Sequence, residues 1–119
     1  MLTPIAASAA YRYQVALACA NGSAMPKAAF LAFGSGSRPY DPATDQGLEA
    51  EFIRVSTSNS VAGPRLTVKG VLTGAQAGSN VVREVAVLTD TGTLMGRRVV
   101  APKELEPETE IEFEIVFEY

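Results

Sequence analysis

The residues best suited to chemistry lie in one glycine-rich stretch, Gly34-Ser-Gly-Ser-Arg38, which follows a short apolar run. Backbone N–H groups of such a turn can bind an anion such as phosphate. A nucleotide-binding P-loop would also need a Gly-Lys-Ser or Gly-Lys-Thr sequence and a following helix, and a dinucleotide fingerprint would need a third glycine. The stretch lacks these features, so we interpret it as a turn.

Two groups of acidic residues could act as metal ligands or acid–base catalysts. Asp41 and Asp45 are four residues apart in the same stretch, but a calcium site needs several more oxygen ligands. Seven glutamates lie within residues 104–119, mostly at alternate positions. A strand would project these in parallel rather than across a substrate. We therefore predict no metal and no cofactor.

The composition also argues against an enzyme. The chain of 119 residues has no histidine and one cysteine, Cys19. Histidine is the usual general base near neutral pH, and Ser–His and Cys–His catalytic pairs cannot form without it. A single thiol forms neither an intramolecular disulfide nor a cysteine zinc cluster. We expect a non-enzymatic protein.

The net charge of −3 is unevenly distributed. Residues 1–103 hold ten Lys or Arg and six Asp or Glu, a sum of +4, whereas residues 104–119 hold seven Glu and no base, a sum of −7. Glutamates on one strand face repel each other unless cations on a neighbouring strand pair with them. We predict such cross-strand pairs. The alternatives are an acidic edge that meets a basic partner and simple solvation.

Neither a nucleic acid nor a membrane is expected as a partner. The arginines are scattered, and we interpret the Arg97-Arg98 pair as a solvated strand or turn. The apolar runs are too short for a membrane-spanning helix. The N-terminal residues lack the basic region of a signal peptide, and Arg12 interrupts the apolar part.

The spacing of apolar and turn-forming residues predicts an α+β fold. Thr3-Pro4 and Asn21-Gly22 are typical of a helix start and a helix end, which predicts a helix over about residues 4–20 that packs on the domain's own sheet. A β-rich part covers residues 27–119 with a long loop at 34–47 and a helical turn near 46–51. We expect one domain over residues 1–119, a mainly antiparallel sheet or sandwich of about six strands. The predicted strands are 27–33, 52–58, 65–73, 81–89, 93–101 and 111–119.

Two groups of motifs follow one another in an order known from a protein family. The first comprises Lys27-Ala-Ala-Phe-Leu-Ala-Phe-Gly-Ser-Gly36, Tyr40-Asp-Pro-Ala-Thr44, Leu48 and Phe52-Ile-Arg54. The second is Val82-Arg-Glu-Val-Ala-Val-Leu-Thr-Asp-Thr-Gly-Thr-Leu94. Over about residues 4–119 the chain resembles the N-terminal attachment domain of phage tail-collar fibre proteins. It departs from that family at Ser35, where an acidic residue is usual.

The resemblance implies a virion protein of the phage tail or baseplate, made in the host cytoplasm, that joins receptor-binding fibres to the tail. It also implies a homo-oligomer whose partners are other tail, baseplate or fibre proteins. Because such domains usually open a longer chain and this sequence ends at Tyr119, we expect a free-standing adaptor. The candidate partner-interface residues are Gly34, Gly36, Arg38, Tyr40, Asp41, Arg83 and Glu84.

A second hypothesis is a small β-sandwich module that binds carbohydrate or another small ligand. Tyr40 in the long loop would be the stacking surface for a sugar, although the chain has no tryptophan. If the loop instead makes the assembly contact, replacing residues 34–47 with a short Gly-Ser linker should leave folding intact and abolish assembly.

Overall fold

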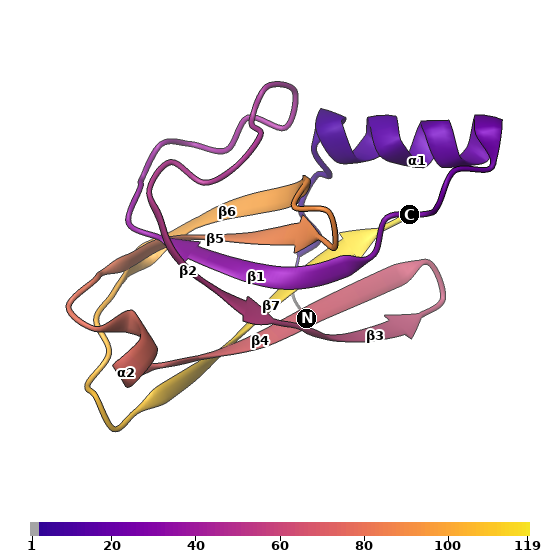
Figure 1. The fold of residues 1–119 in the computed structure, drawn as a ribbon. Helices are drawn as coiled ribbons and strands as arrows, with labels where there is room; N and C mark the ends of the chain where they lie inside the picture. The colour runs from indigo at the N-terminus through magenta and orange to yellow at the C-terminus, as the bar shows by residue number, and fades with distance from the viewer. Residues whose placement is uncertain (1–2) are drawn as a thin grey trace.

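Two antiparallel sheets and an N-terminal helix form the fold in the computed structural model, which describes residues 3–119 (Figure 1). One sheet has the strand order β2-β1-β5-β6 and the other has the order β3-β4-β7. This confirms the α+β prediction. The elements are α1 (Ala9–Asn21), β1 (Ala28–Gly34), β2 (Glu51–Ser56), β3 (Ser58–Ala62), β4 (Arg65–Thr73), α2 (Gly74–Ala77), β5 (Val82–Thr89), β6 (Leu94–Lys103) and β7 (Glu110–Glu118).

The described residues form seven strands rather than about six, because an additional strand, β3, follows the predicted strand 52–58 and overlaps it only at Ser58. The Thr57 N–H donates to the Ala29 oxygen at 3.2 Å, so Thr57 is still bonded to β1 of the first sheet. The next residues leave that sheet, and β3 pairs with β4 in the second. The predicted helical turn near 46–51 is not found. A single turn, α2, lies instead in the turn-rich stretch after β4.

The core lies between the two sheets and follows the alternation of the strands. On β7, Phe113, Ile115 and Phe117 are buried, as their spacing predicts, and the ring of Phe113 meets that of Phe33 at 5.0 Å between centroids. Tyr119, predicted to share this face, is 60% exposed because it lies beyond the end of β7. Burial of these large apolar side chains is the main stabilising contribution to such a sandwich.

The predicted acid–base pairs between strands are confirmed for two glutamates of β7. Lys69 lies opposite Glu114 with 3.3 Å between nitrogen and oxygen, and Arg65 lies opposite Glu118 at 3.0 Å. The glutamates at 104, 106, 108, 110 and 112 are exposed, and within residues 3–119 none of them forms an ion pair. The −7 charge is therefore only partly neutralised inside the molecule.

Helix α1 begins at Ala9, so the predicted start at Thr3-Pro4 is wrong. Ser8 is the N-cap, and its hydroxyl oxygen accepts a hydrogen bond from the Tyr11 N–H at 3.1 Å. The preceding residues are extended, because Ile5 N–H donates to Val116 oxygen of β7 at 3.0 Å and Ser8 N–H donates to Met95 oxygen of β6 at 2.7 Å. This segment connects the open edges of the two sheets.

Helix α1 contacts the sheets mainly through its first turns. Tyr11 is its only fully buried residue, and Gln14 donates from its side-chain amide to the Thr93 hydroxyl at 2.6 Å. Figure 1 shows the rest of the helix beside the sheets rather than across them. The predicted packing on the domain's own sheet therefore applies to the N-terminal part of α1, and Tyr13 is 66% exposed.

Candidate functional site

Glu84 on β5 is the centre of a buried polar cluster. Its side chain has no solvent exposure. Oε1 accepts hydrogen bonds from Glu49 N–H at 2.9 Å and Arg97 Nε at 2.8 Å, and Oε2 accepts from Gly36 N–H and Ala50 N–H, both at 2.8 Å. Four donors satisfy the carboxylate, which compensates for the loss of water.

The glycine-rich turn binds an anion, and that anion is the protein's own Glu84 carboxylate. The Gly36 N–H points at Oε2, and a Cβ atom at position 36 would lie only 2.5 Å from that oxygen. A Cβ at Gly34 would lie 2.7 Å from the Ala50 oxygen. The two glycines are needed for this close approach, so the turn has no free cradle for a phosphate.

Arg97 is fully buried, so its interpretation as a solvated residue is wrong. Its Nε donates to Glu84, and its Nη1 lies 3.4 Å from Asp45 Oδ2. Asp45 also accepts from Arg38 Nη2 at 3.1 Å and from Asp41 N–H at 3.1 Å. Sequence reasoning did not place Arg97 and Asp45 in one site. We refer to Glu84, Arg97 and Asp45 as the Glu84 cluster.

A register shift explains why Arg97, rather than Arg98, joins the cluster. Leu88 lies opposite Leu94, but after the shift Ala86 lies opposite Arg97. Cross-strand partners share a face, so Arg97 lies on the face that Ala86 shares with Glu84. Opposite charges on neighbouring predicted strands were a signal for this pair, but they do not reveal the irregularity that chooses between the two arginines.

Glu84 is ionised at neutral pH despite its burial. Burial alone would raise the pKa of this carboxyl. The hydrogen bonds from the backbone N–H groups of Glu49 and Ala50, from Arg97 and from the Gly36 N–H outweigh burial, and the pKa lies below its ordinary value of 4.5. The cluster therefore contains a buried ion pair at neutral pH.

Tyr40 holds the loop on the outer face of the first sheet. Its half-buried ring packs with Leu48 against a small apolar cluster that includes Ala32 and Leu94. Its hydroxyl donates to the Ala6 oxygen at 2.7 Å. Burial, followed by the nearby charge of Asp45, raises the Tyr40 pKa to about 12. The ring is used within the fold, so Tyr40 is a poor platform for a sugar.

The structure brings most of the predicted interface residues together, but they bind one another. Gly34, Gly36 and Glu84 meet directly, Arg38 and Asp41 join through Asp45, and Tyr40 covers the same face of the sheet. Arg83 is separate, because within residues 3–119 it forms no ion pair with any of these residues.

The long loop is therefore part of the fold. It runs over residues 35–50 between β1 and β2 rather than 34–47. Replacing residues 34–47 would remove Gly36 and Asp45, two partners of the buried charges. We expect that replacement to destabilise the fold itself, which corrects the expectation of intact folding.

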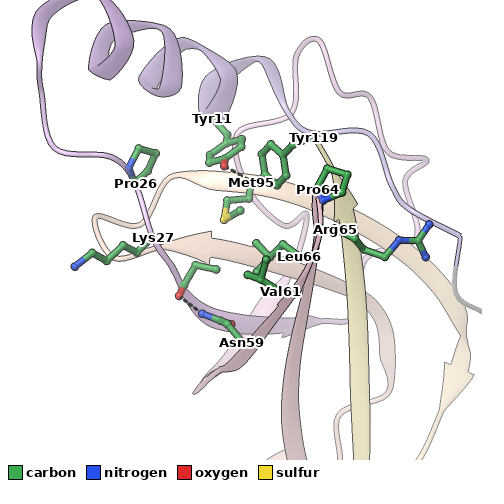
Figure 2. Close-up of a pocket in the computed structure, with 12 residues that line it drawn as sticks. Tyr11, Pro26, Lys27, Asn59, Val61, Pro64, Arg65, Leu66, Met95 and Tyr119 are labelled. Carbon is green, nitrogen blue, oxygen red and sulfur yellow. Dashed lines mark hydrogen bonds between the residues drawn. The ribbon is translucent and has the colours of Figure 1, made fainter.

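A groove with a volume of about 490 Å³ is more accessible to a ligand than the buried Glu84 cluster (Figure 2). It lies between the β3–β4 hairpin and residues 26–28, which lead into β1. Most of its lining is apolar or aromatic, and Figure 2 shows Lys27 and Arg65 on opposite sides of it. Among the described residues no acidic side chain lines it. The larger lining side chains are Tyr11, Val61, Pro64, Leu66, Met95 and Tyr119.

Two tyrosines close one end of the groove. The hydroxyls of Tyr11 and Tyr119 are 2.5 Å apart, and their rings meet edge to face at 6.4 Å. Burial and the hydrogen bond with Tyr11 raise the pKa of Tyr119 well above its ordinary value. On the other side, all five residues of β3 are exposed, including Val61 at 74%. β3 is an edge strand, so one row of its backbone groups is free to pair.

Within residues 3–119, no three His, Cys, Asp or Glu side chains are grouped so that they could hold a metal ion. The same part of the chain has no helix that is long and apolar enough to cross a membrane. No protein-family model, curated protein sequence or solved structure matches the chain.

Proposed function

We propose that this chain is a non-enzymatic structural protein of a phage tail or baseplate that self-associates and connects receptor-binding fibres to the tail. The observation that carries the proposal is that the two motif groups behind the family resemblance form one unit. Gly36 of the first motif donates to Glu84 of the second at 2.8 Å. The resembling residues are therefore the ones that hold the loop, β1 and β5 together, as expected of a shared fold.

Exposed surface supports the self-association part of the proposal. The edge strand β3 has a free side, and the neighbouring groove exposes Val61 and Tyr119. Helix α1 has 13 residues and buries only Tyr11 completely. Free strand edges and exposed apolar grooves are surfaces that recruit further chains. Most of the buried charged atoms, in contrast, bond to one another, and among the described residues only Arg97 Nη2 is buried without a partner.

Immunogold electron microscopy of phage particles that carry this gene tests the assignment. We expect gold particles at the distal tail or baseplate, and loss of fibres from particles in which the gene is disrupted. An antibody against the major capsid protein is the matched control for access to the particle surface. Particles that carry no label and keep their fibres without the gene would overturn the proposal.

A small-ligand module is the second candidate, and the groove is the observation that favours it. Tyr119, which is 60% exposed, would replace Tyr40 as the aromatic platform. A glycan array would then give a binding signal that Tyr119→Ala abolishes and Tyr13→Ala preserves. Tyr13 is the matched control because it is similarly exposed, at 66%, and does not line the groove.

A further inference from the structure

We infer that two copies of this chain pair through the free edges of their β3 strands, antiparallel to each other about a two-fold axis. The inference rests on the self-association in the proposed function and adds to it the surface that makes the contact. Both copies use the same surface, so the contact is isologous and closes at two copies. The two smaller sheets then form one continuous sheet with the strand order β7-β4-β3-β3-β4-β7.

The free edge of β3 presents two residues whose backbone groups point away from β4. Residues along a strand direct these groups alternately to its two sides. Tyr119 N–H donates to the Pro64 oxygen at 2.8 Å, so the even-numbered positions of β4 bond to β7 and the odd-numbered ones to β3. The odd-numbered positions of β4 pair with the even-numbered positions of β3. Asn59 and Val61 therefore direct their N–H and C=O groups outward, where no backbone partner is found within residues 3–119.

The absence of charge sets β3 apart from the other edge strands, which are β2, β6 and β7. Its sequence, Ser58-Asn-Ser-Val-Ala62, has no charged residue and no proline, and all five residues are exposed. In contrast, β2 carries Glu51 and Arg54, β6 carries three cations and Pro102, and β7 carries four glutamates. Charges and prolines keep exposed strand edges from pairing with other chains, so β3 is the unprotected edge. Figure 1 shows β3 below β4, with no further segment on its outer side in this view.

The β3 strand of a second copy is the occupant that fits this edge. The other edges of a second copy are the charged ones, and residues 5–8 already bond to β6 and β7. Antiparallel pairing of β3 with itself, centred on Ser60, overlaps the whole strand. It sets Asn59 of one copy opposite Val61 of the other. These are the residues with outward backbone groups, so the two facing residues exchange both of their hydrogen bonds.

Both faces of the joined sheet accommodate this contact. On the solvent face, Ser60 meets the same residue of the second copy. The nearest cations, Arg65 and Lys69 of β4, each pair with a glutamate of their own chain. Arg65 of one copy lies three strand spacings, roughly 14 Å, from Lys69 of the other. That separation exceeds the screening distance of about 8 Å at physiological salt. On the groove face, Val61 is 74% exposed in the single chain and becomes covered.

Opposite charges at Ser60 test the inference, because the two-fold axis places this exposed residue against itself. Ser60→Lys and Ser60→Glu each set like charges directly opposite one another, which destabilises a strand pair. A contact between two short strands is small, so sedimentation velocity is run up to high protein concentration. Each variant should self-associate about threefold or more weakly than the wild type. Ser79→Lys and Ser79→Glu, at an exposed serine in the turn before β5, are the matched controls and should associate as the wild type does.

A 1:1 mixture of Ser60→Lys and Ser60→Glu should recover association, because a lysine of one copy then faces a glutamate of the other. Val61→Pro gives an independent test, since it removes an outward N–H and leaves the bonds to β4 in place. It should also weaken association. Circular dichroism of every variant confirms that the folded state is retained.

The outcomes separate this inference from self-association in general. If the wild type associates but either Ser60 variant or Val61→Pro associates equally well, or if the mixture fails to recover, the inference is wrong while self-association stands. Impairment of Val61→Pro alone would mean that another segment of the second copy pairs with β3. If the wild type is monomeric throughout, self-association fails as well.

Discussion

The Glu84 carboxylate and the Arg97 guanidinium are both completely buried, 2.8 Å apart, on two neighbouring strands. A buried pair of this kind contributes little net stability compared with an apolar pair, but the loss of one partner leaves an unpaired charge in a medium of low dielectric constant. Glu84 also accepts three backbone hydrogen bonds from the 35–50 loop. The loop, β5 and β6 therefore depend on one side chain.

We predict that Glu84→Gln lowers the free energy of unfolding by about 3–5 kcal/mol, because the new amide group faces N–H donors and Arg97 loses the nearer of its two counter-charges and keeps Asp45 at 3.4 Å. Urea denaturation measures the change. Glu114→Gln is the matched control, since Glu114 is partly exposed and pairs with Lys69 at the surface. It should cost no more than about 1 kcal/mol. Equal effects of the two substitutions would show that the Glu84 cluster is not a stabilising feature.

The lowered pKa of Glu84 gives this contribution a defined pH dependence. A carboxyl group whose folded-state pKa lies below its unfolded value stabilises the fold above the unfolded value, and the contribution is lost as the pH falls through the folded-state pKa. The gap in unfolding free energy between wild type and Glu84→Gln should be constant near neutral pH and shrink below about 4.5. A gap that stays constant or widens in acid would contradict a lowered pKa.

At this scale the sequence identifies Glu84, Gly36 and Arg38 as candidates for a partner interface, and the structure shows the contacts that they make within the chain. The motifs mark where chemistry-bearing groups lie, and they do not say whether the groups face a partner or each other. Arg97 was missed because its face depends on the register shift between Val87 and Leu88. A single irregular residue in a strand reverses every later side chain. Gly96 lies next to this shift, and a glycine inside a strand is the local signal that could have indicated it.

At the scale of elements, the 35–50 loop is held by close backbone contact rather than by apolar area. Gly36 allows this contact, because any Cβ there would press on the Glu84 carboxylate. We predict that Gly36→Ala costs about 1–3 kcal/mol in unfolding free energy, the usual effect of overpacking. Gly47→Ala lies in the same loop with nothing within 4 Å of a Cβ, so it should be neutral or slightly stabilising. Thermal denaturation of both variants measures the difference. If Gly36→Ala leaves the free energy of unfolding unchanged, the close contact between the loop and Glu84 of β5 is not needed for stability.

The start of helix α1 gives another prediction. Ser8 is fully buried; its oxygen accepts from the Tyr11 N–H and its hydroxyl donates to the Leu94 oxygen. Ser8→Ala should cost about 1–3 kcal/mol, because the cap is lost and a buried carbonyl loses its donor. Thr3→Ala, at the cap that the sequence predicts, should change the unfolding free energy by less than about 0.5 kcal/mol. Chemical denaturation of the two variants shows whether Ser8 or Thr3 caps the helix. A larger loss of stability for Thr3→Ala than for Ser8→Ala would instead support a helix that starts at residue 4.

Strands were easier to predict than the helix, and the reason is physical. Two-residue alternation in β4 and β7 records which side chains face the core, so their positions follow from the sequence. Thr3-Pro4 is also compatible with extended structure, and residues 5–8 become extended because β6 and β7 offer unpaired backbone groups. That choice depends on Met95 of β6 and Val116 of β7, which lie far along the chain and are not part of any local pattern.

At the scale of the whole molecule, the two sheets are joined along both open sides. The chain passes directly from β2 to β3 on one side, and residues 5–8 connect β6 to β7 on the other. These connections leave the outer edge of β3, the groove beside it and most of α1 as exposed surface.

Sedimentation velocity of the wild-type protein over a range of concentrations tests self-association, the central claim, most directly. We predict a weight-average sedimentation coefficient that rises with protein concentration and keeps this rise in high salt, because screening acts on charges and the β3 edge carries none. A sedimentation coefficient that remains that of the 12.5 kDa monomer at every concentration and salt level would contradict the claim.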